Sequence, residues 1–402
     1  MVDKEIMAEK KRVCTHRNIH REEKFMLRKL MWSATAAIVA ILAGVGGGVA
    51  KELVYGSGIP AKSDQMVLGM HSYADDLAKA SKGALTMKIL AGSQVVSLYN
   101  TLKALRDGTI DAGFIVPTFT RKELKHVNVI YDTEVFGLDS AAVTGAANET
   151  VLLDCPSCLK DFRDNKAVYL ASFGNNQKGL ICRTPVKTVA DVKGLKIRAV
   201  GATTRLIQEL GGVPVVMGPP DATTAMERGT IDCVHGVVTW LKNFGYWDVA
   251  KYMLETPLGS PRTISSIVYA RRTWDKMTPA EKKAAMDAVP MHLARMVYEV
   301  NVKADGKIKE TAVKEKGVKF TEGGKDFVEF MEKFRAQEQT RIPKLAKEKL
   351  GTENADEIFA TFQKNLVKWE KIAKEKDLAN NPKLMAETFK KEIYDKVDLS
   401  KL

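Results

Sequence analysis

The sequence predicts an α/β fold of two lobes with mainly parallel sheets and a helical C-terminal extension. Apolar residues switch repeatedly between strand and helix spacing over residues 52–316, which is typical of parallel sheets covered by helices on both faces. The chain has 402 residues, about the length of two domains. The hexapeptide Arg106–Asp111 (RDGTID) is nearly repeated at Glu227–Asp232 (ERGTID), as two lobes of related design would require. Ordinary glycine and proline usage, with 28% charged residues, excludes low-complexity disorder and a polytopic membrane protein.

A leader is expected before the folded part. The basic segment Leu27–Leu30 is followed by the uncharged stretch Met31–Ala50, which ends in small residues and predicts a secretory signal peptide cleaved after Ala50. The alternative is a retained membrane anchor, although the glycine run weakens a spanning helix. Residues 1–25 are long for the front of a signal peptide, so Met26 is the expected start. We therefore expect an exported, periplasmic protein.

The formal net charge of +13 does not indicate nucleic-acid binding. The first 50 residues hold nine Lys/Arg and five Asp/Glu, which leaves 53 basic and 44 acidic residues and a charge of +9. Lysines crowd residues 302–393, but acidic residues alternate with them at helical spacing and no aromatic reader motif accompanies them. Solvated helix faces and no nucleic-acid partner are expected.

The first α/β unit covers residues 52–116. One helix carries the apolar stripe Met66, Met70, Tyr73 and Leu77, which recur every three or four residues. The strands of this unit are expected at 52–56, 85–89, where apolar residues alternate, and 110–116, with a second helix ending before Gly108.

The same order recurs further along the chain. Thr188–Asp191 reads as a variant capping box that starts a helix, and Gly194 ends that helix. The remaining expected strands are 195–200, 213–216 and 264–270, and the remaining helices start at about 202, 219 and 279, with further helices over 325–395.

Motifs for catalysis, cofactors or metals were not found. None of the four histidines after residue 50 has a second His or Cys at ligand spacing, so no metal is expected. A nucleophile elbow, a phosphate-binding loop and a dinucleotide fingerprint are also missing from the sequence. We therefore expect a protein that is not an enzyme and holds no cofactor.

The cysteines leave several states open. Cys155 and Cys158 have CxxC spacing and fit an oxidised disulfide, two free thiols or a redox pair. Cys182 and Cys233 fall on expected strands and are interpreted as buried small residues and not as a bridge. Cys14 is expected to leave with the leader.

Arg198 is the candidate binding residue. Leu195, Ile197 and Ala199 share one face of a strand, so Arg198 lies on the other face near the carboxyl end. Ligands of open parallel sheets bind outside the carboxyl ends of strands, and a guanidinium offers a planar fork that matches a carboxylate. A solvated edge charge or a structural salt bridge is the alternative.

Four segments together resemble the dicarboxylate-type solute-binding proteins of tripartite ATP-independent periplasmic (TRAP) transporters. The resemblance runs from about Glu52 to Glu310, and its most specific part is Asp191–Arg198. It implies a periplasmic-binding-protein-like fold whose lobes close on a small organic acid and deliver it to a sodium-coupled membrane permease. The four segments are Ala91–Val95, Leu105–Gly113, Val189–Arg198 and Ala225–Asp232.

The resemblance also assigns site residues. Arg198 falls on the arginine that clamps the ligand carboxylate in this family. Lys178 falls on a second cationic position of some sialic-acid-type members, where a lysine is a point charge and not a fork. Val116 stands where some sugar-acid binders have a polar residue, and Thr118 or Thr120 are candidate sources of a hydroxyl.

The strand after Asp232 departs from the family pattern. The polar contact expected around Gly236 is lost, and His235 and Trp240 are candidate replacements. A packed structural role for His235 is equally compatible with the sequence.

The expected boundaries place lobe one at residues 51–172 and 261–320, lobe two at 173–260, and a helical extension packed on the lobes at 321–402. A monomer is expected. Two other functions stay open: a periplasmic sensor that presents its solute to a receptor, and a secreted hydrolase or isomerase that uses His235 and carboxylates.

Overall fold

The computed structural model describes residues 50–402, which fold around two β-sheets. The predicted leader, the predicted start at Met26 and Cys14 lie outside the described residues. Over the described range, no helix has both the length and the apolar character needed to cross a membrane.

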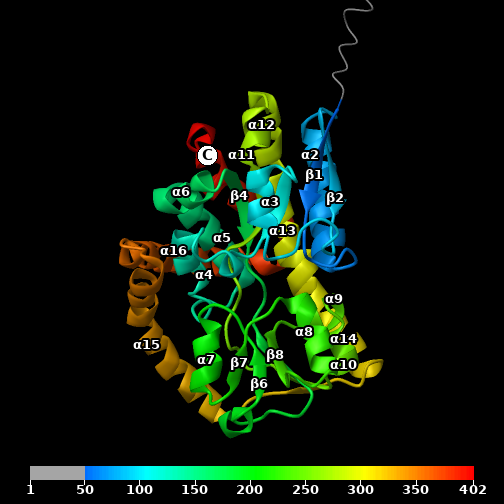
Figure 1. Cartoon of the computed structure of the whole chain (residues 1–402), viewed down its shortest axis with the longest axis vertical. Coiled ribbons are helices and arrows are strands. Elements are labelled where there is room, and N and C mark those ends of the chain that lie inside the picture. Colours follow the sequence, from blue (N-terminus) through cyan, green and yellow to red (C-terminus); the bar gives the residue numbers. More distant parts are fainter. Residues whose placement is uncertain (1–49) are drawn as a thin grey trace, which may run out of the picture. The chain divides into compact units, whose positions relative to one another are not determined.

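Lobe one contains a five-stranded sheet in the order β2-β1-β3-β10-β4 (Figure 1). β1 pairs parallel with β2 and β3, whereas β10 runs antiparallel to β3 and β4. Every residue of β4 and β10 is buried, so these strands form the centre of the lobe. The strands are β1 (Lys51–Gly56), β2 (Leu85–Leu90), β3 (Ala112–Ile115), β4 (Ala167–Phe173) and β10 (Ile264–Ala270).

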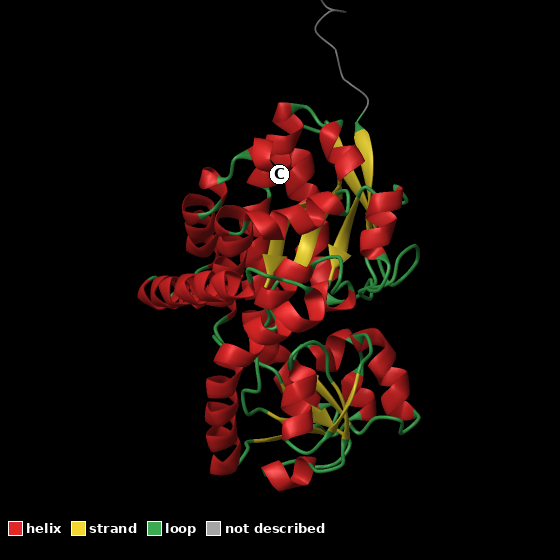
Figure 2. Ribbon diagram, turned by 60° about the vertical axis from the view of Figure 1, so that its left-hand side comes forward, coloured by secondary structure: helices red, strands yellow, loops and turns green. Residues whose placement is uncertain are grey.

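Lobe two contains a six-stranded sheet in the order β11-β9-β5-β8-β6-β7. β6 pairs parallel with β7 and β8, whereas β5 runs antiparallel to β8 and β9. Figure 2 shows one sheet in the upper half of the folded part and the other in the lower half, each with helices around it. The strands are β5 (Gly179–Cys182), β6 (Lys196–Arg198), β7 (Val213–Val215), β8 (Cys233–Gly236), β9 (Tyr252–Leu254) and β11 (Lys319–Thr321).

Helices cover both sheets. Those associated with lobe one are the π-helical turn η1 (Gln65–Met70), α2 (His71–Ala80), α3 (Thr101–Asp107), α4 (Lys125–Tyr131), α5 (Ser140–Glu149), α6 (Pro156–Asp164), α11 (Arg271–Asp275), α12 (Pro279–Asp287) and α13 (Val289–Val297). Those of lobe two are α7 (Thr203–Glu209), α8 (Pro219–Glu227), α9 (Trp240–Asn243) and α10 (Tyr246–Val249), and α14 (Lys303–Lys314) contacts α9.

The predicted local patterns are largely confirmed. Met66, Met70, Tyr73 and Leu77 are all fully buried on η1 and α2, because the stripe faces the sheet. β10 has the predicted bounds, 264–270. The capping box at Thr188 is present, but it starts only a short 3-10 turn, η4 (Val189–Val192).

The sheets are mixed, and parallel pairing is restricted to part of each. The strands that run antiparallel, β10 and β5, are those that follow a passage between the lobes. The chain leaves lobe one after β4, enters lobe two at β5, and returns between β9 and β10. β11 also joins the second sheet, although residues up to 320 were expected in lobe one. A three-residue strand is too short to give an alternating pattern in the sequence.

The C-terminal extension lies against both lobes. Its first helix, α15 (Lys325–Leu350), begins beside lobe two, where the Val189 amide donates to Asp326 Oδ2 over 2.6 Å. Further along α15, Arg335 Nε donates to the Val135 carbonyl of lobe one over 2.9 Å. Figure 1 shows α15 running along one side from lobe two to lobe one. The next helices, α16 (Ala355–Glu375) and α17 (Pro382–Glu392), pack on α5 and α13.

Both cysteine pairs of the described part form disulfides. Cys155 and Cys158 are bridged at the start of α6, one of the states left open. Cys182 and Cys233 are also bridged, so the interpretation as unpaired buried residues was wrong. The antiparallel register of β5 and β8 places these two residues directly opposite each other, a proximity that strand assignment alone does not reveal.

Removing the Cys182–Cys233 bridge is expected to destabilise the protein more than removing the Cys155–Cys158 bridge. The first closes a sequence separation of 51 and the second a separation of 3, and the stabilisation by a disulfide grows with the loop it closes. The double variant Cys182→Ala/Cys233→Ala should lose about 2–4 kcal/mol of unfolding free energy in urea titrations. An equal or larger loss in the matched Cys155→Ala/Cys158→Ala variant would contradict this.

Candidate functional site

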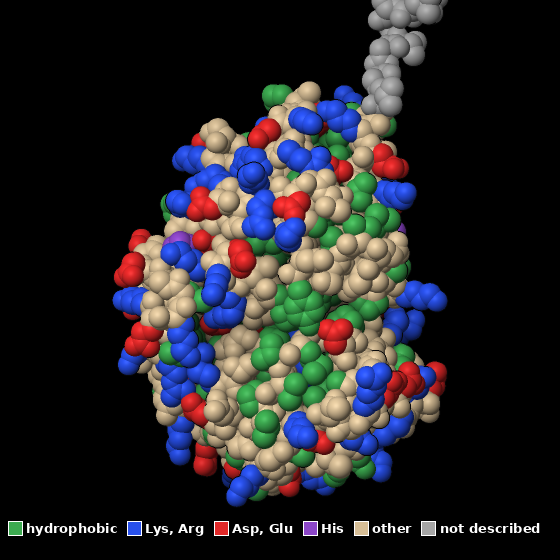
Figure 3. Space-filling view, in the orientation of Figure 1, with side chains coloured by type: hydrophobic (Ala, Val, Ile, Leu, Met, Phe, Trp, Pro, Cys, Tyr) green, Lys and Arg blue, Asp and Glu red, His purple; other side chains and the backbone are tan. Residues whose placement is uncertain are grey.

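A cavity of about 40 Å³ lies between the two lobes, lined by residues of both. The lobe-one walls come from η1, β3, β4 and β10, and the lobe-two walls from β6, α8 and α9. Figure 3 shows hydrophobic side chains gathered across the middle of one face, between the upper and lower halves of the folded part. The cavity walls are mostly apolar and include six aromatic side chains: Phe114, Phe119, Tyr131, Phe173, Trp240 and Phe244.

Arg198 contributes its guanidinium group to the wall of this cavity. It ends β6 as predicted, is 2% exposed, and donates from Nε to the Met217 carbonyl over 2.9 Å. Its guanidinium carbon lies 5.4 Å from the centre of the Trp240 ring, within range of a cation–π contact. Within residues 50–402, no carboxylate pairs with Arg198 and neither Nη atom has a hydrogen-bond partner. Burial lowers the pKa of Arg198, yet a guanidinium stays charged at any relevant pH.

Lys178 also reaches the cavity, but its charge is paired. Its Nζ lies 2.8 Å from Glu134 Oε2, and both side chains are 1% exposed. Burial lowers the pKa of Lys178, and the Glu134 carboxylate opposes that shift. The second expected cation is therefore half of a buried ion pair, whose partner lies 44 residues earlier in the chain.

Gly236 allows the Trp240 ring to pack against the backbone of β8 in lobe two. A Cβ atom at Gly236 would lie 2.5 Å from Trp240 Cε3, so only glycine lets this ring lie against the end of β8. Trp240 lines the cavity and packs edge-on against Phe244, 5.4 Å between ring centres. Gly236 thereby positions an apolar wall and does not replace the lost polar contact.

His235 and Thr118 do not line the cavity. His235 is fully buried on β8, and neither ring nitrogen has a hydrogen-bond partner in the part of the chain that the structure describes. Burial, aided by the positive charges of Lys178 and Arg198, holds the pKa of His235 well below its usual range, so the ring is neutral. Thr118 lies against Gly201, whereas the apolar Val116 does reach the cavity.

The sequence analysis did not anticipate the two amide side chains of the cavity, Gln65 and Asn175. Both are buried, and Gln65 Oε1 and Asn175 Oδ1 have no hydrogen-bond partner among the described residues. Gln65 starts η1, and Asn175 lies in the segment that crosses from β4 to β5. Neither belongs to a motif, so no sequence signal distinguishes them from other amides.

Polar contacts join the lobes beside the cavity. Tyr99, which precedes α3, accepts a hydrogen bond at Oη from the Gly218 amide over 2.7 Å and donates to Asp221 Oδ2 over 2.9 Å. On α9, Lys242 Nζ lies 2.7 Å from Asp64 Oδ1. These contacts hold the two lobes in a closed arrangement.

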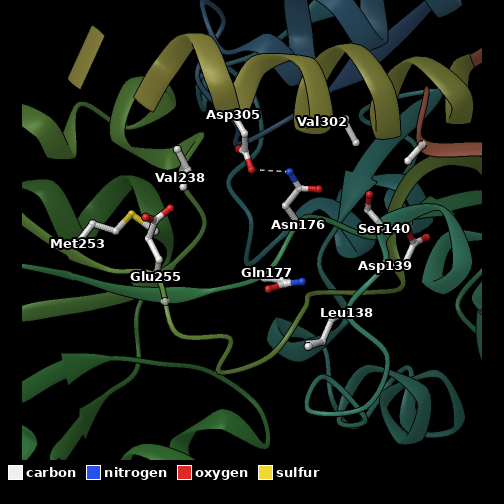
Figure 4. A pocket seen from close by; sticks show the side chains of 12 residues that line it. Leu138, Asp139, Ser140, Asn176, Gln177, Val238, Met253, Glu255, Val302 and Asp305 are labelled. Atoms are coloured by element: carbon white, nitrogen blue, oxygen red, sulfur yellow. Dashed lines mark hydrogen bonds between the residues drawn. The ribbon is translucent and has the colours of Figure 1, made fainter. Parts of the chain in front are cut away.

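A second, more open cavity of about 370 Å³ lies at the crossing between the lobes (Figure 4). Asn176 donates to Asp305 Oδ2 there over 2.5 Å, and Glu255 also lines this cavity. Burial raises the pKa of Asp305 to about 6. No group of three potential metal ligands occurs in residues 50–402.

A buried cavity between two lobes, whose wall holds one cation that is unpaired within the described residues, is the arrangement expected of a solute-binding protein. Residues 56–342 match the family model described as bacterial extracellular solute-binding protein, family 7, and the chain belongs to this family. The resemblance to TRAP-transporter solute-binding proteins is thereby confirmed.

Curated relatives are distant. The chain is 24% identical over 197 residues to the 2,3-diketo-L-gulonate-binding periplasmic protein YiaO of Escherichia coli, covering 48% of this chain and 58% of that protein. It is 23% identical over 241 residues to a solute-binding protein of Albidiferax ferrireducens, covering 59% and 69%. The chain thus spans little more than half the length of the first of these relatives.

Solved structures share the fold. A TRAP solute-binding protein from a marine metagenome, in complex with 3-hydroxybenzoate, has a TM-score of 0.71 at 17% identity and covers 80% of this chain and 99% of its own. A TRAP binding protein of Bordetella bronchiseptica with bound mandelate has a TM-score of 0.67 at 17% identity, covering 79% and 99%. DctP7 of Bordetella pertussis, which binds pyroglutamic acid, has a TM-score of 0.64 at 16% identity, covering 78% and 100%.

Breaking the buried ion pair beside the cavity should be costly. Glu134→Ala leaves the Lys178 ammonium buried and unpaired, so a loss of about 3–5 kcal/mol of unfolding free energy is expected in urea titrations. The double variant Glu134→Leu/Lys178→Met removes both charges and should recover most of that loss.

The matched control for this prediction is Asp164→Ala, which breaks the exposed pair of Lys160 and Asp164. Surface pairs contribute little, so this variant should unfold almost as the wild type does. A Glu134→Ala variant as stable as the control would contradict the prediction.

Proposed function

We propose that this protein is the solute receptor of a TRAP transporter, and that it captures a small organic acid by pairing the ligand carboxylate with Arg198. The observation that carries the proposal is the buried guanidinium without an acid partner in residues 50–402. Its Nε is fixed by the Met217 carbonyl, and both Nη atoms remain for a carboxylate. Bidentate pairing of this kind joins charge to planar geometry.

The names of the relatives support a carboxylate. The fold is shared with proteins whose bound ligands are 3-hydroxybenzoate, mandelate and pyroglutamate, each an organic acid. The sequence relative of Escherichia coli is named for a sugar acid. Proteins of one fold can bind different ligands, so the class of acid follows from this chain's own cavity.

Closure of the two lobes explains how the protein captures its ligand and carries it to the transporter. In the open state a carboxylate reaches Arg198 from water, and closure then excludes water and strengthens the charge-assisted hydrogen bonds. Export by the predicted signal peptide would place the protein in the periplasm, where it meets the membrane subunits of the transporter. We infer binding without turnover, because the cavity presents a cation, amides and apolar walls, with the neutral His235 outside its lining.

Replacing Arg198 by alanine should abolish capture. Truncating one partner of a buried charged hydrogen-bond pair costs about 2–5 kcal/mol, so the Kd of the best-binding carboxylate should rise by more than about thirtyfold. A thermal-shift screen with benzoate, 3-hydroxybenzoate, mandelate and pyroglutamate selects the probe, and titration calorimetry measures its Kd.

The control is Arg228→Ala, which removes an exposed arginine at the end of α8 and should leave the Kd unchanged. Arg198→Lys keeps the charge without the fork and should fall between the two. An Arg198→Ala protein that binds the same acid within twofold of the wild type would refute the clamp.

Tyr99→Phe should weaken binding modestly. This change deletes the hydroxyl that bonds Gly218 and Asp221 across the lobes, and one such hydrogen bond contributes about 0.5–1.5 kcal/mol. We expect a Kd raised by about 2- to 10-fold through faster ligand dissociation, measured by stopped-flow fluorescence. A change in the association rate alone would speak against a role in holding the closed state.

A further inference from the structure

We propose that the cavity selects a compact acid with a single carboxylate, a flat apolar body and one hydrogen-bonding group, and discriminates against dicarboxylates and polyhydroxylated sugar acids. This inference rests on the proposed function, in which Arg198 holds the carboxylate. It is argued from the charge, the walls and the unpartnered amides of the cavity.

Among the residues that the structure describes, only one positive charge in or behind the cavity is available to a ligand. The charge of Lys178 is cancelled by Glu134 at 2.8 Å. Arg262, in the returning segment behind the cavity, is fully buried and already donates to carbonyls of Ser260, Glu134 and Gly137. A second carboxylate would therefore be buried without a counter-charge and near the carboxylate of Glu134, which is unfavourable.

The walls favour a flat apolar body. Six aromatic side chains line the cavity together with aliphatic ones, and the lining that residues 50–402 provide contains no Ser, Thr, Asp or Glu. A ligand with several hydroxyl groups would bury most of them without partners, at a cost of about 1–3 kcal/mol each. Aromatic rings instead offer broad, rigid surfaces against which a planar ligand can stack.

Two side-chain amides can accept a hydrogen bond from the one polar group of the ligand other than its carboxylate. Gln65 and Asn175 are 3% and 2% exposed, and their side-chain oxygens lack partners among residues 50–402. A buried amide without a partner costs free energy, so a ligand hydroxyl or N–H that bonds to one of these oxygens is favoured. Gln65 comes from lobe one and Arg198 from lobe two, so a ligand that bonds to both also favours closure.

The small volume sets the size of the ligand. About 40 Å³ corresponds to roughly three water-sized sites, fewer than the heavy atoms of a ring with a carboxylate, so the walls must move apart to admit such an acid and every further substituent requires a larger movement.

The test compares matched acids on the full chain by titration calorimetry. The probes are benzoate, 3-hydroxybenzoate, isophthalate (which replaces the hydroxyl with a second carboxylate), succinate and gluconate. We expect 3-hydroxybenzoate to bind at least about fivefold more tightly than benzoate, because its hydroxyl satisfies an amide. Isophthalate, succinate and gluconate should bind at least about thirtyfold more weakly than 3-hydroxybenzoate.

Variants connect this preference to named residues. Gln65→Met and Asn175→Leu should reduce the ratio of 3-hydroxybenzoate to benzoate affinity. Gln363→Met alters a half-buried amide outside the cavity, whose Nε2 is buried, and should leave the ratio unchanged. Glu134→Gln removes the carboxylate that pairs with Lys178 and frees this lysine to pair with a second ligand carboxylate, so selectivity should shift towards isophthalate by about tenfold.

The outcomes separate the two proposals. If isophthalate, succinate or gluconate binds most tightly and Arg198→Ala abolishes that binding, the proposed function stands and the selectivity inference is overturned. Binding that does not depend on Arg198, or no binding by any probe, overturns both. Tightest binding by 3-hydroxybenzoate that Arg198→Ala abolishes supports both.

Discussion

A buried positive charge without a carboxylate partner in residues 50–402 determines how the rest of the site is built. Removing Arg198 from water is costly, and the Met217 carbonyl and the Trp240 ring offset only part of that cost. Both neighbours are fixed by lobe two, which keeps the guanidinium oriented before lobe one closes over it. In the proposed mechanism, an anion that completes the hydrogen bonds of Arg198 stabilises the closed state more than the open one.

The two lobes are joined firmly where the chain crosses between them, and only by weak contacts at the cavity. The chain crosses between the lobes beside Asn175 and beside Arg262, and α15 contacts both lobes along its length. At the cavity, in contrast, the lobes meet through partly exposed contacts such as those of Tyr99 and Lys242. Contacts of this kind contribute little free energy each, so the ligand can decide the balance between open and closed states.

The sequence predicts the features that depend on residues close together in the chain, such as strands, helices and their buried faces. It does not predict contacts between segments far apart in the chain. Because side chains alternate along a strand, Arg198 lies on the opposite face of β6 from its neighbour Ile197. The helical stripe that includes Tyr73 is buried as expected. The Cys182–Cys233 bridge depends on the register between two strands, and the antiparallel pairing within each sheet depends on where the chain crosses between lobes. Such contacts join segments that no local period connects.

Lys178 shows why a residue's role depends on what surrounds it. The resemblance places it at a ligand-binding position, and the structure does bring it to the cavity. Glu134, however, forms a buried ion pair with Lys178, so that the lysine is one half of a neutral pair and not a free cation. The number of lysines and arginines near the site therefore overstates the charge that a ligand meets. Since a second ligand carboxylate needs a second free cation, the proposed preference for a single carboxylate depends on Glu134 as well as on Arg198.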